Sequence, residues 1–181
     1  IRDSIGIGQL RSDLLLELKQ YKPAIVRGNA SEIIALASLW GIEANACESS
    51  RPRGVDTTDT VEAARDAAAA LARYTGGAVA VSGKKDLVTD GEKVVYSEGG
   101  SELMEKVTGF GCSQGGVLAV YATATNPFTA ALAAVAHYNV AGSRAAKVAD
   151  APASFKTAFI DELYRATARD IADNPFSVEE A

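Results

Sequence analysis

Histidine and cysteine are scarce in this sequence, and their scarcity limits the chemistry that the chain can carry out. The 181 residues include one histidine, His137, and two cysteines, Cys47 and Cys112. A single histidine excludes a metal site built from several imidazoles. Two cysteines so far apart do not form a disulfide framework, so we expect a reducing, cytoplasmic environment.

Clustered positive charge and long apolar runs are lacking too. The formal net charge is −5, and the lysines and arginines are scattered rather than gathered in a basic stripe, so we expect no nucleic-acid partner. The most apolar stretch, residues 115–140, is interrupted by polar side chains such as Thr123 and Asn126. No uninterrupted run reaches the ~20 residues that a membrane span needs, and no signal peptide is visible. We therefore expect no membrane partner.

What remains is the composition of one globular domain, which we assign to residues 1–181. Hydrophobic residues make up 48% of the chain and charged residues 23%, and this length suits a single domain with its own core. Apolar runs at 24–26 and 78–81 predict buried strands, and Asp90-Gly91 between two β-type segments predicts a hairpin. Strand and helix patterns alternate, which favours a layered α/β fold.

Local signals predict where helices begin and end. Arg27-Gly28-Asn29 predicts a turn, in which Asn29 caps the next helix, and Gly76-Gly77 ends an alanine-rich helix. We expect the tail from residue 174 onward to be loosely held. The expected helices are 12–21, the one after Asn29, one from Thr57 or Thr58 to Thr75, 113–124, 127–148 and 152–171.

A glycine-rich segment, Gly109-Phe110-Gly111-Cys112, lies between a strand-like run at 106–108 and a predicted helix. Glycines let a ligand approach the backbone closely, and a helix start offers unpaired N–H groups and the positive end of a dipole. Together these features predict an anion site, where charge on a migrating phosphate is stabilised. An ordinary turn at the entry of a helix is the alternative interpretation.

Three other motifs nearly fit this chain. The Rossmann motif fails because its third glycine would be Gly115, one residue too late, and the P-loop motif fails because 77–85 has one residue too many and ends in lysine. The sequence GCSQG at 111–115 matches a nucleophile elbow with Ser113 as nucleophile. An acid should then come before the histidine, but no Asp or Glu lies between Ser113 and His137, so the hydrolase interpretation fails.

Four segments resemble the hydroxyethylthiazole kinase family, in the same order and with compatible spacing. They are RGNASEI at 27–33, RGVDTT at 53–58, the stretch 81–91 and KVTGFGC at 106–112. The resemblance implies a three-layer α/β/α, ribokinase-like fold with helices on both faces of the sheet. It also implies Mg²⁺- and ATP-dependent phosphorylation of the hydroxyl of 4-methyl-5-(2-hydroxyethyl)thiazole for thiamine synthesis, by a homotrimer with active sites at its interfaces.

The resemblance assigns roles to particular residues. Cys112 matches the catalytic cysteine, Gly109 a substrate-contacting glycine, and Arg27 an arginine that contacts ATP. Ser82 stands where an ATP-contacting threonine is common, and it keeps the hydroxyl. Phe110 occupies a position that is often small in the family, so we expect its bulk to alter the loop or the substrate pocket.

Two carboxylates are the candidates for holding the metal. Asn29-x-x-Glu32 resembles the N-x-x-E motif found near magnesium in this superfamily. The same spacing fits a helix-capping arrangement, and the two interpretations are compatible. Asp3 matches the aspartate of a D-P-V motif, although Ser4 replaces the proline.

Family members have a substantial portion ahead of the region that matches Asp3, and nothing in this chain corresponds to it. We therefore expect an N-terminally incomplete kinase domain, a sheet without its first strands, and poor binding of the thiazole by this chain alone. Two alternatives stay open. One is another small-alcohol kinase of the ribokinase-like superfamily, and the other is a non-catalytic nucleotide-binding module.

Overall fold

The computed structural model describes residues 5–42 and 61–180, in which helices and strands alternate. In chain order the elements are α1 (Ile5–Leu18), the 3-10 helix η1 (Lys19–Tyr21), β1 (Ile25–Asn29), α2 (Ala30–Leu39), η2 (Val61–Ala64), α3 (Arg65–Thr75), β2 (Ala78–Ser82), β3 (Asp86–Thr89), β4 (Lys93–Ser97), η3 (Glu102–Lys106), α4 (Phe110–Ala122), α5 (Pro127–Ala145), α6 (Pro152–Arg165), α7 (Ala168–Ala172) and β5 (Phe176–Glu180). Within these ranges no helix combines the length and the hydropathy that a membrane crossing requires.

The strands of the described chain form one five-stranded sheet in the order β1-β2-β3-β4-β5. β1 and β2 are parallel, with Ile25 opposite Ala78 and Asn29 opposite Ser82. Each later strand runs antiparallel to the one before it. The carboxyl ends of β1 and β2 therefore lie side by side at one end of the sheet, which is where open α/β sheets commonly bind ligands.

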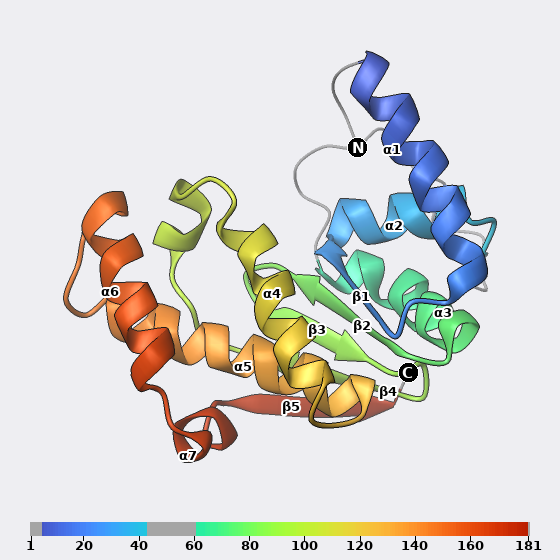
Figure 1. Ribbon diagram of the computed structural model, residues 1–181. Coiled ribbons are helices and arrows are strands. Elements are labelled where there is room, and N and C mark those ends of the chain that lie inside the picture. The colour runs from blue at the N-terminus through green and yellow to red at the C-terminus, as the bar shows by residue number, and fades with distance from the viewer. Residues whose placement is uncertain (1–4, 43–60, 181) are drawn as a thin grey trace.

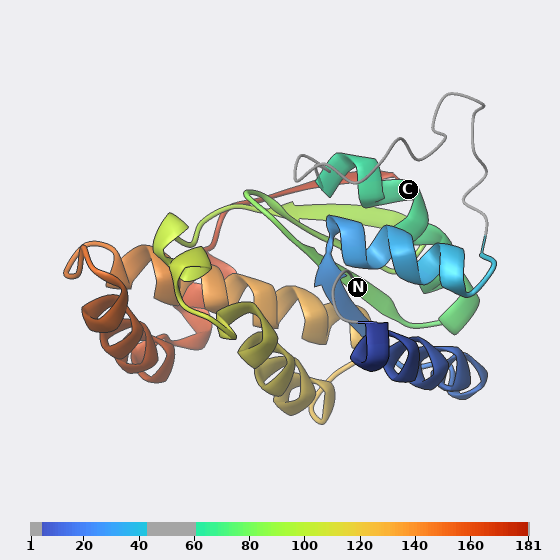
Figure 2. The same cartoon turned by 90° about the horizontal axis from the view of Figure 1, so that it is seen from above.

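Helices cover both faces of this sheet and make three layers (Figure 1, Figure 2). Successive strand residues point to opposite faces. Val79 therefore packs with Leu71 of α3 on one face, whereas its neighbour Ala80 packs with Val135 of α5 on the other. The predicted three-layer α/β/α fold is confirmed.

A cluster of aromatic rings fixes the start of α4 against α5 and α6. The Phe110 ring is buried, and its centroid lies 4.4 Å from that of Phe159, 5.8 Å from that of Phe155 and 6.3 Å from that of Tyr138. Aromatic side chains of this size contribute large buried areas. The ring of Phe110 is thus part of the core, and the expectation that its bulk alters the loop or the substrate pocket stays a prediction.

Several local predictions are confirmed. Asn29 caps α2, and Gly76 ends α3 with a φ of 71°. The hairpin around Asp90 and Gly91 joins β3 to β4, with φ of 94° at Gly91, a conformation that favours glycine. The predicted start of the alanine-rich helix at Thr57 or Thr58 lies outside the described residues.

Other predictions are wrong because long-range pairing overrides local turn signals. Arg27, Gly28 and Asn29 belong to β1 and pair with residues 80–82 of β2 instead of forming a turn. The tail is not loose, because β5 pairs with β4 along its whole length. Segment 27–29 and β5 are therefore strands of the sheet, although their residues, taken alone, indicate a turn and a loosely held tail.

Helix boundaries also differ from those expected. The single helix predicted at 152–171 is divided into α6 and α7, because Thr167 and Asp170 form a capping box that starts a new helix. The run at 106–108 is not a strand, because η3 extends to Lys106 and Val107 follows as its cap. α4 begins at Phe110, three residues before the predicted Ser113, so the glycine-rich segment lies largely within the first turn of a helix.

Candidate active site

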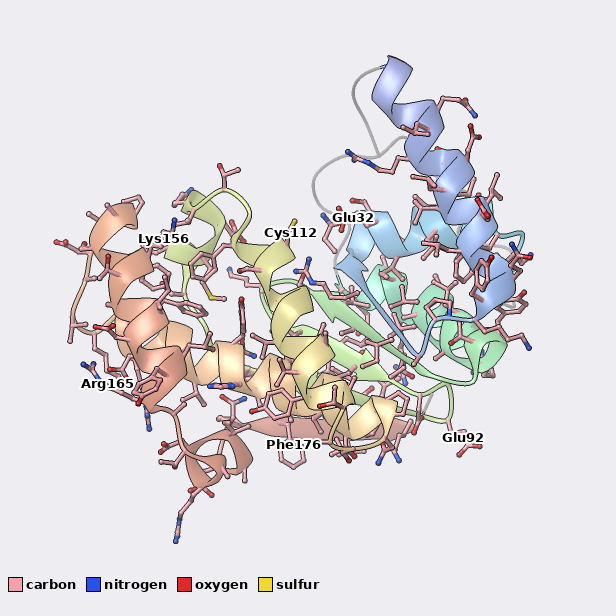
Figure 3. All side chains as sticks on the ribbon, viewed as in Figure 1. Glu32, Glu92, Cys112, Lys156, Arg165 and Phe176 are labelled. Carbon is pink, nitrogen blue, oxygen red and sulfur yellow. The ribbon has the colours of Figure 1, made fainter. Side chains whose placement is uncertain are left out.

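Two helix N-termini meet the carboxyl ends of the parallel strands. α2 begins directly after β1, and the first turn of α4 approaches Arg27 near the end of β1. Cys112 and Glu32 both lie at this end of the sheet, where α4 and α2 begin (Figure 3). Helix N-termini present unpaired N–H groups and a partial positive charge, so this end of the fold favours an anion.

The guanidinium of Arg27 connects three elements of this site. Its Nε donates to Oε1 of Gln114 on α4 at 3.1 Å, and its Nη2 donates to the hydroxyl of Ser82 on β2 at 2.8 Å. Both acceptors are neutral. None of the carboxylates in 5–42 and 61–180 lies within ion-pair distance of Arg27. The side chain is therefore held in place while its charge remains available to a ligand.

Gly111 is required by this arrangement. A Cβ atom at position 111 would lie 2.9 Å from Nη2 of Arg27, closer than side chains normally approach. Only glycine lets the guanidinium rest on the first turn of α4 without displacement. The sequence indicated a glycine for close approach of a ligand, whereas the structure places a protein cation against it.

Gly109 and Cys112 occupy the start of α4. Gly109 is the N-cap residue with φ 79°, in the left-handed region that favours glycine. The N–H of Phe110 donates to the carbonyl of Val107, and the N–H of Ser113 donates to that of Gly109. Between them, the N–H groups of Gly111 and Cys112 have no acceptor among the described residues, and the Cys112 thiol is exposed and free. The predicted anion hole is thus the first turn of a helix.

Asn29 and Glu32 form the capping box that the sequence left open. Asn29 accepts a bond from the N–H of Glu32 at 2.9 Å, and Oε2 of Glu32 accepts one from the N–H of Asn29 at 2.9 Å. Glu32 is exposed, and its other carboxylate oxygen is not used by the cap. In the described part of the chain no three acidic, cysteine or histidine side chains gather as metal ligands, and Asp3 lies outside that part.

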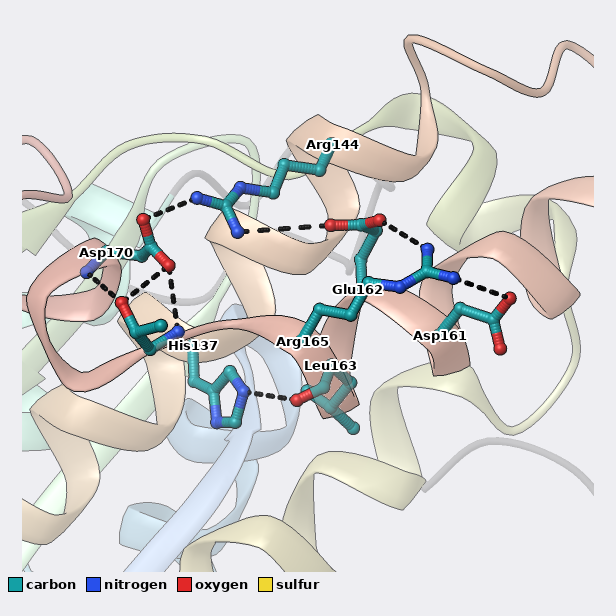
Figure 4. Close-up of polar contacts among 8 residues, drawn as sticks. His137, Arg144, Asp161, Glu162, Leu163, Arg165 and Asp170 are labelled. Atoms are coloured by element: carbon teal, nitrogen blue, oxygen red, sulfur yellow. Dashed lines mark hydrogen bonds and ion pairs between the residues drawn. The ribbon is translucent and has the colours of Figure 1, made fainter.

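The geometry agrees with the rejection of the hydrolase interpretation. The Ser113 hydroxyl bonds to the carbonyl of Phe110 at 2.7 Å and to the hydroxyl of Tyr138 at 2.8 Å. The two ring nitrogens of His137 bond elsewhere. One bonds to the Tyr121 hydroxyl, and the other to the carbonyl of Leu163 (Figure 4). Serine and histidine therefore do not form a nucleophile–base pair.

Sequence reasoning missed Gln114, although the helix carries a signal for it. The buried residues of α4 are Phe110, Gln114 and Leu118, spaced four apart on one face. A glutamine in a stripe that otherwise consists of apolar residues indicates a buried polar contact, because buried amides need partners. Its partner, Arg27, lies 87 residues away in the sequence, a distance that no local pattern reports.

These features define a three-layer α/β/α protein in which an arginine and two helix N-termini converge at the ends of parallel strands. Such sites are suited to phosphate groups.

Comparison with known proteins gives the family. The sequence profile of the Hydroxyethylthiazole kinase family matches residues 3–169, and the chain belongs to this family. The hydroxyethylthiazole kinase of Bifidobacterium longum (strain DJO10A) is 44% identical over 191 aligned residues, covering 96% of this chain and 61% of that protein. That of Bifidobacterium adolescentis is 47% identical over 176 residues, covering 92% and 60%.

A solved structure agrees with the assignment. The hydroxyethylthiazole kinase protein from Pyrococcus horikoshii OT3 superposes with a TM-score of 0.78 at 28% identity, covering 97% of this chain and 62% of that one. The chain therefore spans about three fifths of the length of these relatives.

Proposed function

We propose that residues 1–181 belong to the kinase domain of a protein that transfers the γ-phosphoryl group of ATP to the hydroxyl of 4-methyl-5-(2-hydroxyethyl)thiazole. One observation carries the proposal. Arg27, whose hydrogen-bond acceptors among the described residues are neutral, lies on the first turn of α4 at the carboxyl ends of β1 and β2. The printed names of the relatives support a hydroxyethylthiazole as acceptor. The place in thiamine biosynthesis is proposed from the family resemblance.

Each side chain of the site has a chemical task in this proposal. Arg27 binds phosphate oxygens through the guanidinium N–H groups that Gln114 and Ser82 leave unused, and the Ser82 hydroxyl adds a second contact to ATP. The free N–H groups of Gly111 and Cys112 stabilise the charge on the transferring phosphoryl group. Gly109 leaves open space beside the helix start for the thiazole, since within the described ranges no atom outside its immediate chain neighbours lies within 4 Å of a Cβ built there.

In the transfer step the alcohol oxygen of the thiazole forms a bond to the γ-phosphorus while the bond to the β–γ bridging oxygen breaks. ADP leaves with that oxygen. Cys112 lies at the helix start with its sulfur exposed, where the thiol orients the alcohol or the thiolate accepts its proton. Magnesium supplies neutralisation of the phosphate charge when it is bound. Magnesium would need few protein carboxylates beside phosphates and water, and Glu32 with its unused oxygen would suit such a role. Asp3, outside the described residues, is proposed as a second carboxylate by family resemblance alone.

From the family resemblance we also propose that the protein is cytoplasmic and that it forms a homotrimer whose active sites lie at subunit interfaces.

The decisive experiment measures phosphorylated thiazole formed from Mg-ATP by wild type, Cys112→Ala and the matched control Cys47→Ala. We expect Cys112→Ala to lower turnover roughly hundredfold, as the loss of a proton-transfer group does, and the control to retain it. If a phosphorylated product formed only with another small alcohol, that alcohol would be assigned as the substrate in place of the thiazole. Because we expect this chain alone to bind the thiazole poorly, the assay is run up to saturating thiazole. Nucleotide binding without turnover under that condition would favour a non-catalytic module.

A further inference from the structure

A buried carboxylate, Asp86, lies next to the candidate site but outside every role described above. It is the first residue of β3 and is only 9% exposed. Oδ1 accepts a bond from the N–H of Gly83 at 3.0 Å, and Oδ2 accepts one from Nδ2 of Asn139 at 3.0 Å. Desolvation by burial raises the pKa of Asp86. Burying a carboxylate costs free energy, so a buried and hydrogen-bonded aspartate at this position indicates a specific role.

The Gly83 bond connects Asp86 to the nucleotide end of the sheet. Gly83 directly follows Ser82, whose hydroxyl accepts from Nη2 of Arg27 and also bonds to the carbonyl of Gly28 at 3.4 Å. By holding the N–H of Gly83, Asp86 fixes the first residue of the turn between β2 and β3. The position of the Ser82 hydroxyl, and with it the position of Arg27, depends on that turn.

Asp86 also acts on Arg27 through space. The two charges attract without touching, and this attraction opposes the rise in the pKa of Asp86 that burial causes. The arginine therefore has a distant counter-charge, while its donors contact no carboxylate in the part of the chain that the structure describes.

Asn139 holds the other side of Asp86 from the middle of α5. It is 3% exposed, and its Nδ2 also donates to the hydroxyl of Ser97 at 3.1 Å. The same hydroxyl accepts from Nδ2 of Asn174 at 3.0 Å. The buried contacts thus run from the turn after Ser82 to the start of β5, which gives Asp86 a rigid support.

The other end of β3 provides an internal comparison. Asp90 follows β3 and holds the next turn, because its Oδ1 accepts bonds from the N–H groups of Glu92 and Lys93 at 3.1 Å each. Asp90 is partly exposed and needs no buried partner. A β-turn can therefore be capped by aspartate at the surface. The burial of Asp86 and its bond to Asn139 exceed what a turn alone requires.

We propose that Asp86, clamped by Asn139, is a positioning residue that sets the Ser82 turn and the Arg27 guanidinium for the nucleotide. This inference rests on the proposed function, in which Arg27 and Ser82 contact ATP.

The test compares Asp86→Asn with Asp90→Asn by calorimetric titration of Mg-ATP. An amide at position 86 must direct its NH₂ group at either the Gly83 N–H or the Asn139 amide, so one donor loses its acceptor. We expect Asp86→Asn to weaken binding about tenfold, the effect of one unsatisfied buried group. Asp90→Asn keeps its accepting oxygen and should bind like wild type.

An exchange of the two residues distinguishes positioning from mere structural support. In Asp86→Asn combined with Asn139→Asp, the amide at 86 donates to the carboxylate at 139, while its oxygen still accepts from Gly83. We expect this double variant to fold and to recover affinity to within about twofold of wild type. It carries the test if the single variant does not fold, and failure to restore binding would overturn the proposal.

Amide hydrogen exchange at Gly83 separates the possible failures. We expect faster exchange in Asp86→Asn and wild-type protection in the exchanged double variant. Lost protection at Gly83 with unchanged Mg-ATP affinity would contradict the positioning role and leave the proposed function standing. A wild-type chain that does not bind Mg-ATP, with Gly83 protected as described, would instead contradict the proposed function and remove the basis of this inference.

Discussion

Two arginines in different regions of the molecule have opposite surroundings. Arg144 on α5 lies between carboxylates, with Nη2 2.5 Å from Asp170 of α7 and Nη1 3.9 Å from Glu162 of α6 (Figure 4). Arg27 is held by a glutamine and a serine. The charge of Arg144 is satisfied within the protein and ties three helices together. The charge of Arg27 is fixed in position and forms no ion pair with a carboxylate of residues 5–42 and 61–180, which is the condition that a phosphate site requires.

The largely apolar cavity of the molecule and the polar region around Arg27 lie in different places. A cavity of about 310 Å³ lies between α5, α7 and β5, and its lining includes Leu132, Ile171 and Phe176. It is largely apolar and offers no charge to bind a nucleotide. The Arg27 region has the cation and the free N–H groups. Chemistry rather than cavity size therefore locates the candidate site in this chain.

The largest expected effect is the loss of Mg-ATP affinity when the charge of Arg27 is removed. Arg27→Gln should weaken Mg-ATP binding roughly hundredfold, because charge-assisted bonds to phosphate are lost. The matched variant Arg144→Gln should lower the urea midpoint of unfolding and leave Mg-ATP binding unchanged. Calorimetric titration and urea unfolding on both variants measure the two effects. Equal losses of Mg-ATP affinity in both variants would contradict the distinction.

A smaller effect is expected at Gly111, where only the placement of Arg27 changes. Gly111→Ala introduces a Cβ 2.9 Å from Nη2 and should displace the guanidinium, which weakens Mg-ATP binding about tenfold. Alanine also favours helix over glycine by roughly 0.5–1 kcal/mol, so thermal stability should not fall.

Gly115→Ala and Gly116→Ala are its controls, because no atom of the described residues outside the neighbouring helix backbone lies within 4 Å of a Cβ built at either position. Both should gain stability without losing affinity. If Gly111→Ala bound Mg-ATP as tightly as these controls, the fit of Arg27 to the helix would have no functional value.

Features that depend on neighbouring residues could be predicted from the sequence, whereas contacts between distant residues could not. The capping box at Asn29, the end of α3 at Gly76 and the hairpin at Asp90 depend on residues a few positions apart, and local patterns found them. Segment 27–29 carries turn residues, yet pairing with β2 makes it a strand. The contacts of Arg27 join positions 55 and 87 residues apart, so only the folded chain brings them together.

The smallest effect concerns Asp170, beside Arg144. Hydrogen bonds from Thr167, and then the bond and charge of Arg144, lower the pKa of Asp170 from 3.8 to about 2. A carboxyl with a depressed pKa in the folded state adds stability above its unfolded pKa, and that stability is lost as the pH falls towards its folded pKa. Asp170→Asn should therefore lower the urea midpoint slightly at pH 7, and the difference from wild type should shrink between pH 3.8 and about 2.

Asp173→Asn is the control for this pH dependence. Asp173 faces Arg169 at 3.6 Å in an exposed pair, and such pairs contribute little to stability. Its urea midpoint should follow that of wild type at every pH. A difference between wild type and Asp170→Asn that stays constant down to pH 2 would show that the carboxylate charge of Asp170 is not involved.

The central claim is that nucleotide binds where Arg27 meets the first turn of α4. It is tested most directly by adding Mg-ATP to the ¹⁵N-labelled chain and following its backbone amide resonances by NMR. We expect the amide resonances of Gly111, Cys112, Ser82 and Gly83 to shift saturably. The resonances of Ile171 and Phe176 should not change. Shifts gathered around the apolar cavity at Ile171 and Phe176, with Gly111 and Cys112 unchanged, would contradict it.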